Sequence, residues 1–228
     1  MKKRITIAID GFSSTGKSTI AKQLAKELGY NYVDTGAMYR AVTYYAMQQH
    51  FVGSDFLKTD ALIDNLKNVN LKFKYNEKLK FSEMFLNDIN IEKEIRTIEV
   101  SKLVSKVSAI SEVRKKLVFE QQEMGKNSGI VMDGRDIGTV VFPDAELKLF
   151  MTASADKRAT RRYKELLDRG DNVNYEEILH NVQERDRLDS TREDSPLTKA
   201  SDAIEFDNSD MGLKEQFERI MTLVNARI

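Results

Sequence analysis

Cysteine is absent from this sequence of 228 residues, which excludes a disulfide framework and a zinc site built on thiolates. A charge of one sign is also lacking, because Lys plus Arg and Asp plus Glu both number 36, so no overall field favours nucleic acid or an anionic membrane. No stretch approaches the roughly 20 apolar residues that cross a bilayer. The basic start at residues 1–4 precedes a short strand rather than the longer apolar region of a secretory signal. We therefore expect a soluble, cytoplasmic protein that binds neither nucleic acid nor membranes.

The most specific local motif is G-x-x-x-x-G-K-S at residues 11–18. An apolar run at residues 5–10 precedes it as an expected strand, and a helical pattern begins at Lys17, so the context is not that of a chance match on a surface loop. The two glycines let consecutive N–H groups point at a phosphate, and the helix N-terminus attracts the same anion. Lys17 can reach the β- and γ-phosphates, and Ser18 can bind the accompanying magnesium. The motif predicts an ATP or GTP site made of Gly11, Phe12, Ser13, Ser14, Thr15, Gly16, Lys17, Ser18 and Thr19.

Strand and helix patterns alternate at both ends of the chain. Further strands are expected at residues 31–34, 130–133, 147–151 and 203–206. Helices are expected at residues 17–28, 37–50, 99–110, 111–124, 155–169, 175–189 and 213–228. This order implies parallel pairing in a doubly wound α/β domain, with the chemistry in loops at the carboxyl ends of the strands. One such loop is expected at residues 134–139.

The middle of the chain has a different pattern. Residues 71–75 and 79–81 alternate apolar and polar side chains, and short apolar pieces follow at residues 84–86 and 89–91. The pattern predicts a small antiparallel sheet with one solvated face, which does not belong inside a parallel sheet. We therefore expect an inserted subdomain at residues 62–96. A cluster of lysines on it fits a solvated strand face better than a polyanion site: Lys72, Lys74 and Lys80.

Two carboxylates lie at the ends of expected strands. Asp133 ends a buried apolar strand, which suits a residue that orients magnesium or its water ligands. Asp10 is the alternative for this role. An isolated Asp at a strand end often caps a turn instead, but the neighbouring phosphate loop favours the metal.

Arginines are concentrated in two consecutive expected helices and the exit of the second. They are Arg158, Arg161, Arg162, Arg185, Arg187 and Arg192. Acidic residues on the same helices would also fit an ordinary solvated surface. In a chain that binds a triphosphate, however, arginine can contact phosphoryl oxygens and compensate charge during transfer. Carried on a mobile lid, these side chains would also exclude water, the competing acceptor.

Longer motifs cover nearly the whole chain. They are I-A-I-D-G-F-S-S-T-G-K-S-T at 7–19, D-T-G-A-M-Y-R at 34–40, E-I-R-T at 94–97, D-G-R-D-I-G-T-V-V-F-P-D-A at 133–145, R-A-T-R-R at 158–162, R-D-R-L-D-S-T-R at 185–192 and S-P-L at 195–197. With these motifs the sequence resembles the bacterial cytidylate kinases, a branch of the nucleoside monophosphate kinase family. Phe12 departs from the family, which more often has proline there. Since this position contributes mainly backbone, we expect activity to be retained.

The resemblance implies a P-loop kinase fold of the α/β class, with a central five-stranded parallel sheet flanked by helices. A small antiparallel-sheet insertion would bind the monophosphate, and a short helical lid would cover the site. The single kinase domain, 1–228, would have its core at 1–61, 97–154 and 190–228, its insertion at 62–96 with adjoining helices to about 124, and its lid at 155–189. The implied reaction transfers the γ-phosphoryl group of ATP to CMP or dCMP, with Mg²⁺, giving ADP and CDP or dCDP.

The resemblance also assigns catalytic and metal-binding residues. The catalytic group would comprise Lys17, Arg135, Arg158, Arg161 and Arg162. The metal would be held by Ser18 and, through water, by Asp133. No nucleophilic side chain is required, because an oxygen of the CMP phosphate attacks the γ-phosphorus itself.

For CMP, the resemblance assigns contacts to the phosphate, the base and the sugar. The phosphate contacts would be Thr35, Arg40 and Arg135, the base contacts Ser105, Arg114 and Asp136, and the sugar contacts Arg185, Asp189 and Arg192. A carboxylate such as Asp136 accepts from the cytosine amine, and Arg114 donates to N3 and O2. Uracil would set its O4 against the Asp136 carboxylate and its N3–H against Arg114. These two buried mismatches cost several kcal/mol, enough to favour cytosine over uracil by about a hundredfold or more.

Two other functions share the first motif. Another small-molecule P-loop kinase, acting on adenylate, uridylate or shikimate, would do so, although a zinc-lidded adenylate kinase needs cysteines that this chain lacks. A regulatory GTPase would need a guanine-reading N-K-x-D motif, which the sequence does not contain. We expect ATP and CMP or dCMP as the partners of a monomeric enzyme.

Overall fold

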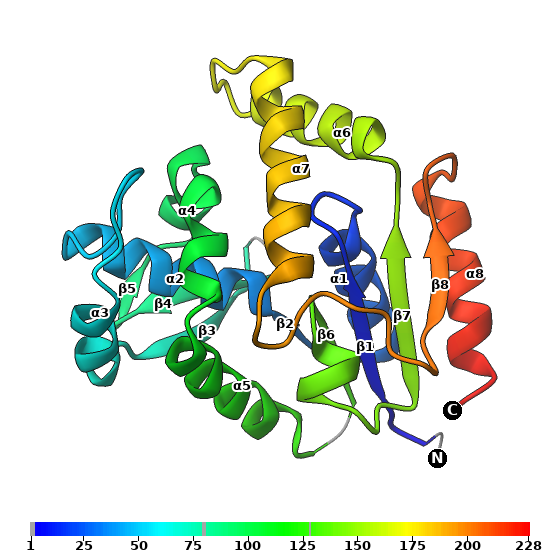
Figure 1. Ribbon diagram of the computed structural model, residues 1–228. Coiled ribbons are helices and arrows are strands. Elements are labelled where there is room, and N and C mark those ends of the chain that lie inside the picture. Colours follow the sequence, from blue (N-terminus) through cyan, green and yellow to red (C-terminus); the bar gives the residue numbers. More distant parts are fainter. Residues whose placement is uncertain (1–2, 79–80, 128) are drawn as a thin grey trace. The chain divides into compact units, whose positions relative to one another are not determined.

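The computed structural model describes residues 3–78, 81–127 and 129–228 (Figure 1). A strand was expected at residues 79–81. Its first two residues, which include Lys80, lie outside the described residues. The chain divides into two compact units, the first made of Met1–Val33 and Met124–Ile228 and the second of Asp34–Glu123. The division into core, insertion and lid stays a prediction. Among the described residues, no helix combines the length and the apolar character that a bilayer span requires.

The first unit is built around a parallel sheet of five strands in the order β2-β6-β1-β7-β8, which confirms the expected fold class. The strands are β1 (Thr6–Gly11), β2 (Asn31–Asp34), β6 (Ile130–Gly134), β7 (Leu147–Thr152) and β8 (Ile204–Asp207). The central strand is β1, in which Ile7 pairs with Val131 of β6 and with Leu147 of β7. The loop that follows β1 therefore leaves the middle of the sheet at its carboxyl edge, where α/β sheets hold their ligands.

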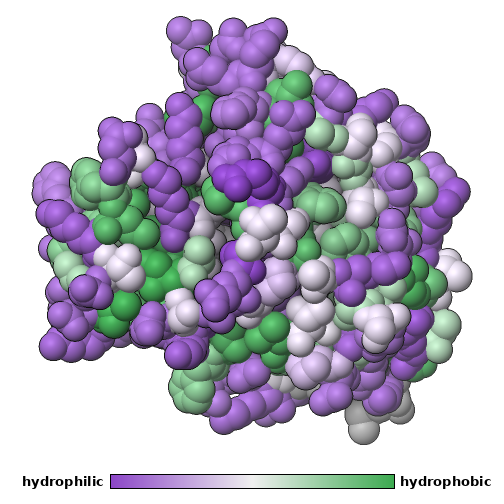
Figure 2. All heavy atoms as spheres, viewed as in Figure 1, coloured by the Kyte–Doolittle hydropathy of each residue, from purple (hydrophilic) through white to green (hydrophobic). Residues whose placement is uncertain are grey.

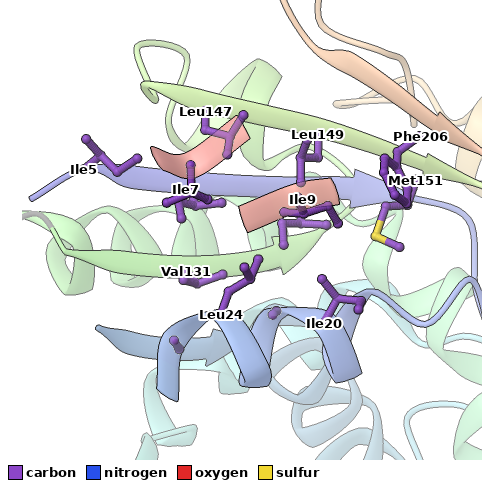
Figure 3. Packing of buried hydrophobic residues seen from close by; sticks show 14 residues of the cluster. Ile5, Ile7, Ile9, Ile20, Leu24, Val131, Leu147, Leu149, Met151 and Phe206 are labelled. Atoms are coloured by element: carbon purple, nitrogen blue, oxygen red, sulfur yellow. The ribbon is translucent and has the colours of Figure 1, made fainter. Parts of the chain in front are cut away.

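Helices α1 (Lys17–Leu28) and α8 (Leu213–Asn225) pack on one face of this sheet. Alternation along β1 turns Ile7 and Ile9 to that face, where they meet Ile20 and Leu24 of α1 (Figure 3). Ile220 of α8 belongs to the same cluster. Each of these side chains is fully buried, and each contributes about 1.5–3 kcal/mol relative to exposure. The same alternation sends Asp10 to the opposite face. A strong apolar face thus anchors the first turn of α1 beside the end of β1.

Two more helices of the first unit carry the arginines: α6 (Ala155–Asp168) and α7 (Tyr175–Thr191). They pack against one another, and the rings of Tyr163 and Tyr175 meet edge to face with their centroids 5.9 Å apart. Figure 2 shows mainly hydrophilic side chains over this pair.

The second unit joins helices to a small antiparallel sheet in the order β3-β4-β5. Its elements are α2 (Thr35–Gln48), α3 (Thr59–Asn65), β3 (Leu71–Asn76), β4 (Phe81–Leu86), β5 (Ile89–Asn90), α4 (Ile98–Ser108) and most of α5 (Ser111–Gly125), with short 3₁₀ turns at Leu66–Asn68 and Glu94–Arg96. Leu71 and Leu86 pair on the buried face. On the other face, Lys72 and Lys74 are half exposed and form ion pairs of 3.1 and 3.4 Å with Asp88. This agrees with a solvated strand face.

Several expected boundaries were wrong. The helix expected at 37–50 begins at Thr35, because the Asp34 carboxylate caps it by accepting from the Ala37 amide at 2.9 Å, and it ends at Gln48. The sequence patterns missed α3, and they broke β4 into pieces although it is continuous from Phe81 to Leu86. In the loop expected at 134–139, Gly134 belongs to β6 and Ile137–Val141 forms a π-helical turn. Smaller differences of one to three residues occur at other element ends, where capping decides the last turn.

Candidate nucleotide site

The phosphate loop is shaped by three residues with positive φ. Gly11 ends β1 at φ 141°, and a Cβ there would lie 2.0 Å from the carbonyl oxygen of Met151 in β7. Ser14 has φ 59°, and Gly16 caps α1 at φ 90°. The Gly16 carbonyl already accepts from the amides of Thr19 and Ile20 at 3.1 and 3.2 Å. Strand, loop and helix thus follow the arrangement that the motif predicts.

Lys17 folds back into the loop that precedes it. Its Nζ donates to the Phe12 carbonyl at 2.5 Å and lies 3.4 Å from the Thr15 hydroxyl, which itself donates to the same carbonyl at 3.0 Å. The side chain is buried, and this burial, together with the nearby Arg135, lowers the pKa of Lys17 well below its ordinary value. The charges of Asp133 and Asp10 oppose the lowering. The amine is thus held inside the loop by the loop's own oxygens.

Ser18 and Asp133 are brought together from opposite parts of the sequence. The Ser18 hydroxyl donates to one oxygen of the Asp133 carboxylate at 2.9 Å. The other oxygen accepts from the Tyr32 hydroxyl at 2.8 Å, so the carboxylate is oriented from both sides. The sequence reasoning missed Tyr32, because an aromatic residue inside an apolar strand pattern carries no sign of this bond.

The Asp10 carboxylate is bonded to the backbone of the turn that follows β6. Its two carboxylate oxygens accept from the backbone amides of Ile137 at 2.8 Å and of Gly138 at 2.7 Å. Burial raises the pKa of Asp10 to about 7, although these amides lower it. The carboxylate thereby fixes the π-helical turn after Asp136, whose carbonyl accepts from the amides of Val140 and Val141. The Asp10 carboxylate is thus bonded to the backbone of a turn, whereas the Asp133 carboxylate lies beside the Ser18 hydroxyl.

Arg135 and Asp189, both predicted to contact CMP, form an ion pair of 2.9 Å. Burial alone would raise the pKa of Asp189, but Arg135, Arg185 and Arg192 hold it below its ordinary value. Burial, with Arg135 next in importance, lowers the pKa of Arg185 to about 10. Asp136 is buried next to Arg135 in sequence. The guanidinium of Arg192 donates twice to the Ser195 carbonyl, at 2.8 and 2.6 Å.

The three arginines of α6 that were predicted to act on the phosphates contact protein groups. Arg158 forms two bonds with Asp186, at 2.9 and 2.5 Å, and its guanidinium lies 5.1 Å from the centre of the Phe12 ring. Arg161 donates to the Asn208 side chain at 3.0 Å, and Arg162 pairs with Glu165 on its own helix at 2.9 Å. The Phe12 ring therefore does more than the backbone role expected of this position. Contact between these arginines and phosphates stays a prediction.

In the second unit, the D-T-G-A-M-Y-R motif surrounds the start of α2. Thr35 is buried in the first turn, and Arg40 is half buried one turn later, where a Cβ on Gly36 would lie 3.3 Å from its Nη1. Arg96 donates to Asp34 at 2.9 Å. Burial alone would raise the pKa of Asp34, but the charges of Arg96 and Arg40 lower it to about 2. Arg96 was missed as a partner of Asp34, although the E-I-R-T motif contained it.

The two base contacts predicted on helices lie in consecutive elements of the second unit. Ser105 is buried in α4. Arg114 is buried in α5, where its Nη1 donates to the Ser108 carbonyl at 3.0 Å and its guanidinium lies 5.2 Å from the centre of the Tyr39 ring. These contacts hold the Arg114 side chain in one orientation.

Comparison with known proteins identifies relatives along the whole chain. The model of the family described as cytidylate kinase matches residues 7–226. The cytidylate kinase of Flavobacterium johnsoniae is 66% identical over 223 residues, which are 98% of this chain and 97% of that protein. The cytidylate kinase of Bacteroides fragilis is 55% identical over 219 residues, 96% of each chain. Among solved structures, an uncharacterized protein from Eubacterium ventriosum aligns with a TM-score of 0.51 at 12% identity, covering 99% of this chain and all of that one, and shares the fold alone.

Proposed function

The chain belongs to the cytidylate kinase family, which transfers a phosphoryl group from ATP to CMP or dCMP, and from this premise we propose the part that each of its residues takes in the reaction. The observation that carries the proposal is the group formed by Lys17, Ser18 and Asp133. The glycine-shaped loop holds the buried amine of Lys17, and the Asp133 carboxylate of β6 orients the Ser18 hydroxyl. Such a group binds and neutralises a magnesium-bound triphosphate.

Magnesium fits the Ser18–Asp133 pair. It prefers hard oxygen ligands and is commonly bound through one or two protein groups, with water and phosphate oxygens completing its shell. A hydroxyl and a carboxylate oxygen 2.9 Å apart supply such groups. Held by the Ser18 hydroxyl and, through water, by the Asp133 carboxylate, the ion would supply positive charge that compensates the phosphates as the leaving group departs. Tyr32 supports this role by fixing the second carboxylate oxygen.

The transfer itself needs positioning and charge rather than a covalent intermediate. A phosphate oxygen of CMP forms a bond to the γ-phosphorus while the bond from that phosphorus to the bridging oxygen breaks, and the electron pair leaves with ADP. Lys17 stabilises the charge on the transferring group, and the loop amides hold the β-phosphate. Burial lowers the pKa of Lys17 in the free protein. The negative charge of a bound triphosphate raises this pKa again, so the amine is charged in the complex. Arg135, Arg158, Arg161 and Arg162 supply further positive charge.

The acceptor is held by polar residues whose types match its parts. Thr35, Arg40 and Arg135 contact the CMP phosphate, and Arg185, Asp189 and Arg192 contact the sugar. Ser105, Arg114 and Asp136 read cytosine through its amine and its two acceptors. The buried positions of Asp136 and Arg114 support this proposal, because a mismatched partner then leaves a buried polar group unpaired.

The helical pair at residues 155–189 acts as a lid that brings its arginines to the phosphates and excludes water. We further propose that the enzyme is cytoplasmic, is monomeric and does not bind nucleic acid. The balanced charge of 36 basic and 36 acidic residues supports the last of these.

A coupled assay of ADP formation tests the function. The enzyme is incubated with ATP, Mg²⁺ and one of CMP, dCMP, UMP or AMP. We expect turnover with CMP and dCMP at a kcat/KM at least about a hundredfold above that for UMP. Comparable turnover with AMP, or ATP hydrolysis that does not depend on any acceptor, would contradict the proposal.

A further inference from the structure

Asn208 is the first residue after β8 and is fully buried. Its amide N–H donates to the Thr152 carbonyl at the end of β7 at 3.0 Å, which places its side chain at the carboxyl edge of the sheet. None of the sequence motifs includes it. A buried carboxamide must have its donors and acceptor satisfied, and the partners that it finds here are informative.

The side chain joins three elements of the first unit. Its Nδ2 donates to the Thr15 carbonyl in the phosphate loop at 2.6 Å and to Gln216 Oε1 in α8 at 2.9 Å. Its Oδ1 accepts from Nη1 of Arg161 in α6 at 3.0 Å, and its backbone carbonyl accepts from Nη2 of the same arginine at 2.7 Å. One residue thus contacts both the loop and an arginine that we assign to the lid.

The bond to Thr15 has a consequence for the next residue. The peptide unit between Thr15 and Gly16 is planar and trans, so its C=O and N–H point in opposite directions. A Thr15 carbonyl held toward Asn208 therefore directs the Gly16 N–H away from Asn208. The left-handed φ of 90° at Gly16 continues this geometry into the first turn of α1. Nη1 of Arg161 also donates to the Thr15 carbonyl, at 3.4 Å, so the carboxamide, bonded at 2.6 Å, and the arginine together fix the orientation of a loop amide.

We propose that Asn208 is a positioning residue that couples the lid helix α6 to the phosphate loop, acting on ATP through the Thr15 carbonyl and on transfer through Arg161. The inference rests on the proposed function, which gives the loop and Arg161 their roles. Only a carboxamide can donate to two oxygens and accept from a guanidinium at the same time. A carboxylate would keep the bond to Arg161 but could not donate to Thr15.

Two variants separate these contacts. In Asn208→Asp, we expect the KM for ATP to rise about tenfold with kcat within about threefold of wild type, because the shorter of the two bonds to the Thr15 carbonyl is lost and the arginine contact remains. In Asn208→Leu, we expect the same rise in KM together with a fall in kcat of about tenfold or more. The KM for CMP should stay within about threefold in both. In an Arg161→Ala background, Asn208→Leu should still raise the KM for ATP but should lower kcat no further.

Gln216→Leu is the matched control, since it removes a buried carboxamide bonded to Asn208 but touches neither the loop nor Arg161. Melting temperatures are measured for all variants, and Asn208→Asp serves if Asn208→Leu does not fold. Unchanged ATP kinetics in both Asn208 variants, or equal effects in Gln216→Leu, would overturn the inference and leave a structural role. If Arg161→Ala alone leaves kcat unchanged, the proposed lid role of Arg161 fails instead.

Discussion

Removing Arg96 should destabilise the protein in a way that depends on pH. Arg96 donates to Asp34 at 2.9 Å and to Glu92 at 2.8 Å, and Asp34 is only 6% exposed. The pKa of Asp34 is lowered from 3.8 to about 2, chiefly by Arg96 acting against burial. At about 1.4 kcal/mol per pKa unit, this ionised carboxylate contributes about 2.5 kcal/mol of stability at neutral pH. Because the folded pKa is depressed, that contribution is complete above pH 3.8 and is lost as the pH falls through about 2.

The substitution Arg96→Met reverses the sign of this dependence. Without its partner, Asp34 is a buried carboxylate whose pKa rises, so the variant should lose about 3 kcal/mol or more at pH 7. Urea unfolding at pH 7, 5.5 and 4 should show the gap between wild type and variant shrinking as the pH falls, because the variant protonates Asp34 in this range. The double variant Arg96→Met/Asp34→Asn should recover part of the loss, since the amide oxygen can still cap α2.

Arg219→Met is the control for this experiment. Arg219 forms an exposed ion pair of 2.7 Å with Glu215, so its loss should cost less than about 1 kcal/mol at every pH. If Arg96→Met costs no more than the control, or if its effect is the same at pH 7 and pH 4, then Arg96 does not hold a buried charge and the argument is refuted.

Three further predictions concern catalysis. Lys17→Ala should lower kcat by at least about a hundredfold without lowering the melting temperature by more than a few degrees, and near-normal turnover would remove the phosphate-site assignment. Amide hydrogen exchange in residues 155–189 should be faster than in the central strands without nucleotide and should slow with ATP and CMP together, whereas equal protection in both states would argue against a closing lid. Asp136→Asn should reduce the preference for CMP over UMP, since its carboxamide can donate to the uracil O4, and Arg114→Met should raise the KM for CMP while leaving that for ATP nearly unchanged. An unaltered ratio of kcat/KM values in Asp136→Asn would show that this carboxylate does not read the base.

Local patterns were enough to predict the elements that face a continuous core. The strand at residues 31–34 and the helix at residues 17–28 were predicted to the residue, because their apolar spacing and the Gly29 cap depend only on near neighbours. The short helix α3 was not predicted, because seven residues with one buried side chain show almost no periodic spacing of apolar residues. The π-helical turn escaped it too, because that turn depends on Asp10, more than a hundred residues away in the chain.

The sequence by itself determined the fold class, the phosphate loop and the family, since glycine positions, strand and helix periods and long motifs are all properties of neighbouring residues. Only the tertiary structure decided which polar groups pair. It joined Ser18 to Asp133 across 115 residues, Asp34 to Arg96 across 62 and Thr15 to Asn208 across 193. It also distinguished the two aspartates that the sequence could only rank as candidates for the metal. Asp10 accepts from backbone amides of a turn, whereas Asp133 accepts from the Ser18 hydroxyl. The physical reason is that a buried polar group must find a partner wherever packing places one, and packing brings together residues that no local pattern connects.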